Sequence, residues 1–149
     1  MPVAAHSEKS HNQTLLVVED NIDSAALLSI LLKEEGYRVL LAHDGQQGLD
    51  MARQLRPDVI LMDIGLPLMD GWIVARMLRE DGSSQTVMVA MSGYGQPDDL
   101  ERSLKAGFDL HLTKPLDLNA LLNYLNARRK AVPPKTPGPT TCYEMGSSV

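Results

Sequence analysis

The chain has 149 residues, which is about the length of one domain and enough to bury one sizeable core. Its formal net charge of −5 at pH 7 disfavours a nucleic-acid-binding domain, because such domains carry a clustered basic surface. The single cysteine excludes a disulfide framework, no apolar stretch reaches the roughly 18 residues of a membrane span, and residues 1–13 lack the apolar core of a signal peptide. We therefore expect a soluble cytoplasmic protein that has neither a nucleic acid nor a membrane as partner.

Apolar runs alternate with helical periodicities along the chain. Five runs predict buried strands, at residues 15–18, 39–42, 59–62, 87–91 and 110–113. Helical spacing and capping signals predict five helices, which begin near Ile22, after Gly45, and near Trp72, Pro97 and Leu118. This alternation favours an α/β fold, a parallel sheet covered by helices on both faces. The domain is expected over residues 14–130, between a disordered polar leader, 1–13, and a disordered tail, 131–149, rich in Pro, Gly, Ser and Thr.

Two of the predicted helices carry specific expectations about burial. The first has more apolar residues than one stripe needs, namely Leu27, Leu28, Ile30 and Leu31. We expect this excess to belong to the core, with a partner-binding surface as the alternative. In the second helix we expect Leu49, Ala52 and Leu55 to point inward.

Reactive side chains stand where four of the five predicted strands end: Glu19 and Asp20, Asp63, Ser92, and Lys114. Each of them alone can be explained as a cap or a surface charge. Parallel strands end at one edge of a sheet, and in open α/β sheets this edge is where ligands bind. We therefore expect the five side chains to meet there.

The chemistry of such a cluster points to phosphoryl transfer. Three carboxylates at close range repel one another and require a cation, and oxygen-only ligands favour Mg²⁺ over Zn²⁺. Lys114 supplies a point charge for a phosphate oxygen, and Ser92 supplies a hydroxyl donor. With the charge screened in this way, the carboxylate of Asp63 can attack phosphorus and become an aspartyl phosphate.

Over roughly residues 14–129 the chain resembles the receiver (CheY-like) domain of two-component response regulators. The resemblance rests on four motifs in the family's order and spacing: the acids Glu19-Asp20, the segment D-x-x-[ML]-P-x-[ML]-D-G at Asp63–Gly71, the hydroxyl residue Ser92 and the pair Lys114-Pro115. It implies a doubly wound, flavodoxin-like sheet of five parallel strands in the order 2-1-3-4-5, flanked by five helices.

The resemblance also implies how the site is assembled. Asp63 is then the phospho-acceptor. Mg²⁺ is held by Asp20, Asp63 and the backbone carbonyl of Gly65, while Glu19 acts through water. The peptide bond before Pro115 is expected to be cis, a state that proline makes tolerable.

One position departs from the family's pattern. In the family, the hydroxyl residue, here Ser92, moves toward the phosphate, and an aromatic residue three positions before the lysine, usually Tyr or Phe, swings inward behind it. The chain has His111 at this switch position, and His111 is smaller, polar and titrates near neutral pH. Receivers of hybrid sensor kinases often carry histidine there, so the resemblance favours membership of a phosphorelay. The alternative, a packed and hydrogen-bonded His111 without a switching role, stays open.

As a receiver, the chain would take a phosphoryl group from a sensor histidine kinase or a histidine phosphotransfer protein onto Asp63. It would catalyse only its own phosphorylation and dephosphorylation, and it would not be a turnover enzyme. The resemblance places the contact with an unidentified downstream protein, and a possible homodimer contact, on the fourth helix, the fifth strand and the fifth helix.

Three other functions remain as alternatives. A phosphatase of the haloacid dehalogenase type needs a second acid two positions after Asp63, where the chain has Gly65. A flavin-binding, flavodoxin-like module shares the fold, but Gly93–Asp98 lacks the last glycine of a dinucleotide fingerprint. A receiver fold kept as a non-phosphorylated interaction scaffold is disfavoured, because the reactive residues at the strand ends are all intact.

We also expect Tyr94, two residues after Ser92, to shield the phosphoryl group, so that Tyr94→Ala speeds its hydrolysis.

Overall fold

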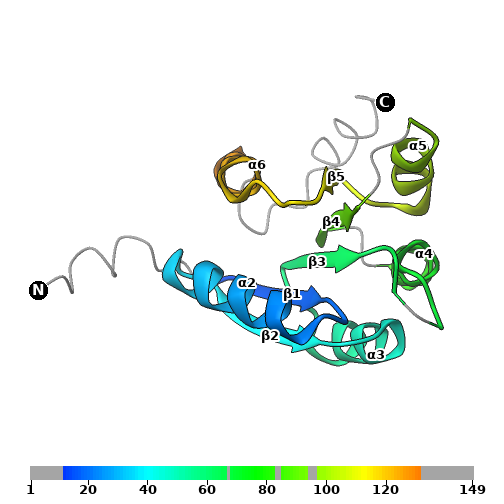
Figure 1. The fold of residues 1–149 in the computed structure, drawn as a ribbon, viewed down its shortest axis with the longest axis horizontal. Helices are drawn as coiled ribbons and strands as arrows, with labels where there is room; N and C mark the ends of the chain where they lie inside the picture. The colour runs from blue at the N-terminus through cyan, green and yellow to red at the C-terminus, as the bar shows by residue number, and fades with distance from the viewer. Residues whose placement is uncertain (1–11, 67, 83–84, 94–96, 132–149) are drawn as a thin grey trace, which may run out of the picture. The chain divides into compact units, whose positions relative to one another are not determined.

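The computed structural model describes residues 12–66, 68–82, 85–93 and 97–131, and each predicted strand and helix is present in it (Figure 1). The strands are β1 (Thr14–Val18), β2 (Arg38–Ala42), β3 (Val59–Asp63), β4 (Val87–Ser92) and β5 (Leu110–Thr113). The helices are α2 (Ile22–Glu34), α3 (Gly45–Leu55), α4 (Gly71–Glu80), α5 (Pro97–Ala106) and α6 (Leu118–Ala131). Tyr94 and most of the predicted leader and tail lie outside the described residues.

The five strands form one sheet, and every pair in it is parallel. Their order is β2-β1-β3-β4-β5, which confirms the predicted doubly wound arrangement. In the register of the central pair, Val18 lies opposite Met62, so Glu19 and Asp63 follow at the same level of the sheet. Because all strands run in the same direction, their carboxyl ends form a single edge.

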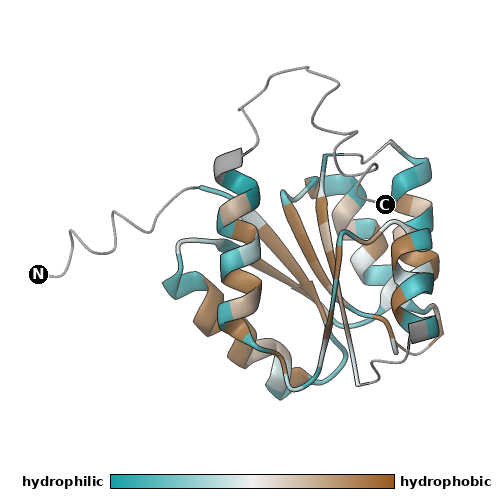
Figure 2. Cartoon of the chain, turned by 90° about the horizontal axis from the view of Figure 1, so that it is seen from above, coloured by the Kyte–Doolittle hydropathy of each residue, from teal (hydrophilic) through white to brown (hydrophobic). Residues whose placement is uncertain are grey.

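The strands are hydrophobic over most of their length, whereas the helices have hydrophobic and hydrophilic sides (Figure 2). The main core cluster lies on one face of the sheet, where alternate strand residues such as Leu16, Ile60 and Met88 meet side chains of α3, α4 and α5. On the other strand positions, Leu15, Val17 and further side chains are also buried. Burial on both faces is typical of a parallel sheet and explains the continuous apolar runs.

Two expectations about burial are wrong in part, although α3 does bury Leu49 and Ala52 as predicted. Leu27 and Ile30 of α2 are each 57% exposed, and Leu55 at the end of α3 is 50% exposed. The buried residues of α2 are Ala25, Ser29 and Leu32, which form one narrow stripe. A helix on the surface of a sheet has only one such stripe to bury, so apolar residues outside it face away from the core. The alternative for this excess, a partner-binding surface, therefore stays open.

Helix starts near the sheet edge are fixed by side-chain caps. The side chains of Asn21, Asp44 and Asp70 accept hydrogen bonds from backbone N–H groups in the first turns of α2, α3 and α4. At the start of α4, Gly71 lies so close to the end of β3 that an added Cβ would stand 2.8 Å from the Cα of Ile64. A glycine is needed there, because it lets α4 begin directly beside the strand that carries Asp63.

By internal contacts the chain divides into two units, residues 1–114 and 115–149. The first unit holds the whole sheet and α2 to α5, and the second holds α6. The side chain of Asp117 accepts a hydrogen bond from the backbone N–H of Ala120 and so caps the start of α6. Among the described residues, every helix is too short or too polar to cross a bilayer.

Candidate functional site

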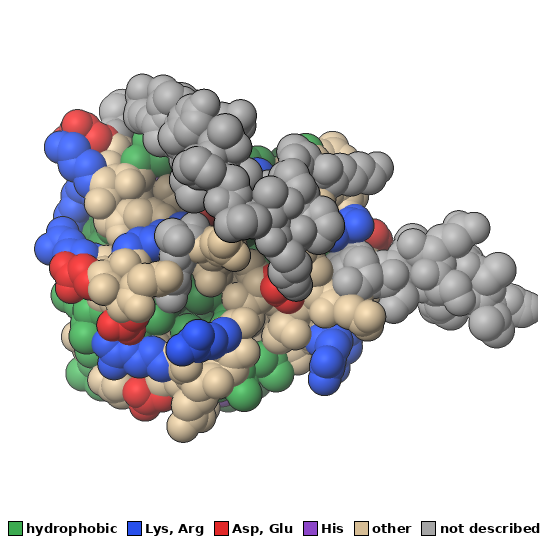
Figure 3. Space-filling model, turned by 180° about the vertical axis from the view of Figure 1, so that it is seen from behind, with side chains coloured by type: hydrophobic (Ala, Val, Ile, Leu, Met, Phe, Trp, Pro, Cys, Tyr) green, Lys and Arg blue, Asp and Glu red, His purple; other side chains and the backbone are tan. Residues whose placement is uncertain are grey.

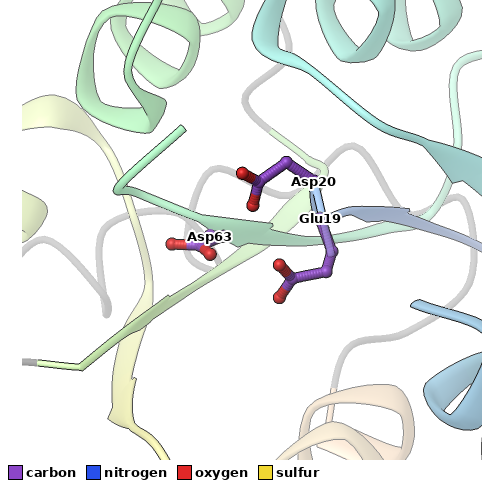
Figure 4. Close-up of side chains that lie close together, drawn as sticks. All are labelled: Glu19, Asp20 and Asp63. Atoms are coloured by element: carbon purple, nitrogen blue, oxygen red, sulfur yellow. The ribbon is translucent and has the colours of Figure 1, made fainter. Parts of the chain in front are cut away.

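Three carboxylates gather at the carboxyl ends of β1 and β3 (Figure 4). Glu19 and Asp20 directly follow β1, and Asp63 is the last residue of β3. One oxygen from each of the three lies within 4.8 Å of the others. Glu19 and Asp63 are only 1% and 7% exposed, whereas Asp20 is exposed. The strand ends thus deliver two buried acids and one open one to a single point.

Backbone groups hold the two buried acids in place. The backbone N–H of Asn21 donates to Oε2 of Glu19 over 3.1 Å, and that of Gly65 donates to Oδ1 of Asp63 over 2.8 Å. The other oxygen of each acid, Oε1 of Glu19 and Oδ2 of Asp63, is bound by Lys114. Both side chains are therefore oriented by two donors each, which fixes the carboxylate planes.

Lys114 joins the two buried acids. Its Nζ lies 2.9 Å from Oδ2 of Asp63 and 3.1 Å from Oε1 of Glu19. The residue follows β5, and its backbone N–H donates to the carbonyl of Ser92 over 2.7 Å, which ties it to the end of β4. One ammonium against three carboxylates leaves the cluster with an excess of negative charge when all of these groups are ionised.

The environment shifts the pKa of two of these groups. Burial is the largest influence on Glu19 and raises its pKa; the hydrogen bonds from Asn21 and Lys114 oppose this without cancelling it. Partial burial works to lower the pKa of Lys114, but its hydrogen bonds to Asp63 and Glu19 outweigh it and the pKa is raised. Lys114 thus stays charged at neutral pH, while Glu19 resists ionisation.

The donor set fits a magnesium ion. All three acids offer oxygen, and their summed charge exceeds what Lys114 can balance. Mg²⁺ holds its ligands at about 2.1 Å, so two oxygens on one ion lie at most about 4.2 Å apart. The three acids each offer an oxygen within 4.8 Å of the others, which is close enough for them to share one ion directly or through water.

Ser92 and His111 are also brought together. Ser92 ends β4 and is 3% exposed, and its Oγ lies 2.9 Å from Nε2 of His111. The other ring nitrogen of His111, Nδ1, lies 2.7 Å from Oγ of Ser103. That oxygen also accepts a 2.9 Å hydrogen bond from the indole N–H of Trp72. His111 is thus half-buried and hydrogen-bonded at both ring nitrogens.

Ser103 and Trp72 are site neighbours that the sequence analysis missed. Ser103 on α5 is fully buried, whereas the apolar side chains of Leu100 and Leu104 on the same helix are 38% and 61% exposed. A buried serine requires a hydrogen-bond partner. Ser103 lies three positions before Ala106, and this helical spacing to a small apolar residue is the signal that could have indicated its burial.

A hollow of about 230 Å³ adjoins Asp63 and is also lined by residues that include Gly65, Trp72 and Ser92. It lies where a group attached to Asp63 would stand next to the Ser92 hydroxyl. A larger hollow, of about 760 Å³, is lined by Arg53, Asp58 and other residues. It contains none of the predicted site residues.

Residues 15–126 of the chain match the family described as the response regulator receiver domain. The chain is 37% identical over 114 residues to the DNA-binding dual master transcriptional regulator RpaA of a Synechocystis strain, which covers 76% of this chain and 47% of that protein. It is 36% identical over 116 residues to the DNA-binding response regulator MtrA of Mycobacterium leprae, covering 78% and 51%. The chain therefore spans about half the length of these curated relatives.

Among solved structures, the Francisella response regulator 1452 receiver domain is similar, with a TM-score of 0.73, 28% identity, and coverage of 78% of this chain and 95% of that one. The chemotaxis response regulator CheY4 of Vibrio cholerae has a TM-score of 0.72 and 27% identity, and the match covers 78% of this chain and 98% of that one. A third similar chain comes from the co-crystal structure of the Saccharomyces cerevisiae histidine phosphotransfer protein Ypd1 with the receiver domain of Ssk1. Its TM-score is 0.69 at 28% identity, and the match covers 74% of this chain and 83% of that one.

Proposed function

Because this chain belongs to the response regulator receiver domain family, we propose that it accepts a phosphoryl group on Asp63 and transmits the signal through protein contacts. The observation that carries the proposal is the contact of Lys114 with both Asp63 and Glu19, beside a third acid. This arrangement is suited to a nucleophilic carboxylate that must meet a negatively charged phosphoryl donor.

In the proposed reaction a carboxylate oxygen of Asp63 attacks the phosphorus of a phosphohistidine on the donor protein. The new O–P bond forms as the P–N bond breaks, and the electron pair of that bond stays on the imidazole of the donor. Lys114 and Ser92 line the path of the transferred group and stabilise its oxygens by charge and by hydrogen bonding. The product is an acyl phosphate on Asp63.

We assign Glu19, Asp20, Asp63 and the carbonyl of Gly65 as the groups that would hold Mg²⁺. When bound, the ion supplies positive charge that neutralises the phosphoryl oxygens and the acids. The residues of the chain do the rest: Lys114 and the N–H of Gly65 orient Asp63, and Ser92 offers its hydroxyl. The cis form of the peptide bond before Pro115 belongs to the same proposal.

The proposed donor is a sensor histidine kinase or a histidine phosphotransfer protein in the cytoplasm. Support comes from the similarity to the structure that pairs a receiver domain with the phosphotransfer protein Ypd1. The relatives RpaA and MtrA are described as DNA-binding, but they are about twice as long as the matched region. On the face seen in Figure 3, Lys and Arg side chains are interspersed with Asp and Glu, which suits a protein partner better than nucleic acid.

For output, we propose contact with a downstream protein, or with a second copy of the chain, through α5, β5 and α6, the fourth helix, fifth strand and fifth helix in chain order. The family resemblance supports this assignment. The chain would act as a signalling component that phosphorylates and dephosphorylates only itself.

The proposal is tested by incubating the protein with acetyl phosphate and Mg²⁺ and measuring its intact mass. We expect a gain of one phosphoryl group in the wild-type protein and none in Asp63→Asn. Asp23→Asn, which alters an exposed acid in α2, should gain the group like the wild type. No gain in the wild-type protein, or a gain that persists in Asp63→Asn, would overturn the proposal, and the first result would favour an interaction scaffold.

A further inference from the structure

Four side chains form one continuous line of hydrogen bonds from the phosphorylation site into the space between α4 and α5. Trp72 on α4 donates to Ser103 on α5, Ser103 contacts His111 on β5, and His111 contacts Ser92 at the end of β4. The three distances are 2.9, 2.7 and 2.9 Å. Ser92 and Trp72 both line the hollow beside Asp63.

The number of hydrogens on each group indicates which partner donates in each hydrogen bond of this line. The indole N–H of Trp72 can only donate, so Oγ of Ser103 accepts from it. The Ser103 hydroxyl has a single hydrogen, and its second partner in the structure is Nδ1 of His111. Donation of that hydrogen to Nδ1 satisfies both groups and leaves Nδ1 unprotonated. A neutral imidazole then carries its hydrogen on Nε2 and donates it to Oγ of Ser92.

We propose that Trp72, Ser103 and His111 are positioning residues that fix the tautomer of His111 and thereby direct the hydroxyl hydrogen of Ser92 at the phosphoryl group on Asp63. Ser92 accepts from the imidazole, so its own hydrogen points to a different acceptor. With the opposite tautomer, Ser92 would have to donate to the ring and would present lone pairs to the phosphoryl oxygens. The inference rests on the proposed function.

The surroundings of these side chains favour one fixed orientation of the hydrogen bonds. Ser103 is fully buried and Ser92 is 3% exposed, so water has little access to the two hydroxyls that would have to rotate. In a buried chain of this kind, each hydrogen bond polarises the next one. At the outer end, the guanidinium of Arg102 lies 3.7 Å from the centre of the Trp72 ring, a cation–π contact that holds the indole.

The first test needs no phosphorylation, because ¹⁵N NMR of the imidazole reports the tautomer of His111 directly. We expect the Nε2–H form in the wild-type protein and a mixture of both forms in Ser103→Ala, where Nδ1 loses its donor. Ser29→Ala, which alters another buried serine on α2, should leave the tautomer unchanged. An Nδ1–H form in the wild-type protein, or an unchanged tautomer in Ser103→Ala, would overturn the proposal.

The second test asks whether the line acts through Ser92. Ser103→Ala should slow phosphorylation of Asp63 by acetyl phosphate about three- to tenfold, which corresponds to one hydrogen bond. In a Ser92→Ala background the same change should have no further effect, as a double-mutant cycle requires. An equal loss in both backgrounds would assign Ser103 a merely structural role and would refute the relay. Failure of the wild-type protein to be phosphorylated would refute the proposed function instead, and the NMR result would still decide the direction of the line.

Discussion

At the level of single residues, the site depends on one cation that serves two buried acids. Lys114 is the only side chain in the described part of the chain found to bridge Asp63 and Glu19. Without it, two buried carboxylates would face each other without compensation, and the transferred phosphoryl group would lose a fixed positive charge. The side chain of Lys114 is 36% exposed, so its charge is also accessible to an incoming phosphoryl group.

Lys114→Met tests this directly, because methionine keeps much of the side-chain length and removes the charge. We expect the rate of Asp63 phosphorylation by acetyl phosphate to fall about a hundredfold, the usual effect of losing one preorganised charge or donor. Lys105→Met is the matched control, because Lys105 is 74% exposed and pairs with Glu101 one turn away. A similar loss in both variants would contradict the role given to Lys114.

Glu19 makes a prediction about pH. Burial raises its pKa in the folded protein, so the folded state binds this proton more tightly than the unfolded chain does. The cost of ionising Glu19 is absent below its unfolded pKa of 4.5 and fully present above its folded pKa. In Mg²⁺-free buffer, Glu19→Gln should therefore be more stable than the wild-type protein at pH 8, and the difference should shrink as the pH falls toward 4.5.

The measurement is the free energy of urea-induced unfolding of both proteins across this pH range. Groups away from the cluster titrate alike in the two proteins, so the difference reports Glu19 together with its interactions with Lys114 and Asp63. A stability difference that grows on acidification would contradict the raised pKa.

At the level of elements, Arg79 connects α4 to the residues just before β4 and β5. Its side chain donates to the carbonyls of Gly107 and Thr86 over 2.9 Å each, and to Oδ2 of Asp109 over 3.0 Å. Asp109 in turn accepts from the backbone N–H of Met88 at the start of β4. The packing is close, since a Cβ on Gly107 would stand 2.5 Å from Cγ of Arg79.

Arg79→Met should destabilise the protein by about 2–4 kcal/mol, because it leaves Asp109 and two carbonyls without this donor in a largely buried place. Arg53→Met is the natural comparison. Arg53 and Asp81 form an ion pair whose side chains are 43% and 39% exposed, and solvent screens such pairs so that they contribute little to stability. Urea unfolding of both variants measures the contrast, and equal losses would show that burial of the Arg79 pair adds nothing.

The contacts between elements also mark what the sequence could predict. The strands and the acids at their ends were predictable from the residues, because a buried parallel strand is a continuous apolar run and the first polar residue after it marks its end. The order of the strands came from the resemblance to the receiver family. The rotation of each helix was not. Leu27 is exposed and Ser103 is buried because packing against the sheet, not hydrophobicity alone, selects the inward stripe. Contacts such as Trp72 to Ser103, 31 residues apart, depend on that rotation.

At the level of the whole molecule, the proposed phosphorylation site and the fold depend on the same central strands. Glu19 and Asp20 follow β1 and Asp63 ends β3, and these two strands are neighbours in the middle of the sheet. An unfolded chain does not hold the three acids together, so a divalent cation that binds them binds the folded state selectively. Such a ligand stabilises the folded protein by mass action, by about 2.7 kcal/mol at a concentration one hundred times its Kd.

We therefore expect Mg²⁺ to raise the Tm of the protein in a concentration-dependent way and EDTA to reverse the shift. Asp20→Asn should lose most of this shift because it removes one of the three acids. In the absence of Mg²⁺ it should be at least as stable as the wild-type protein, since it relieves repulsion within the cluster. Asp23→Asn, three residues along the chain and exposed, should keep the full shift. Because Asp20 is exposed, its replacement disturbs little of the core, so a shift that survives in Asp20→Asn would place the cation elsewhere.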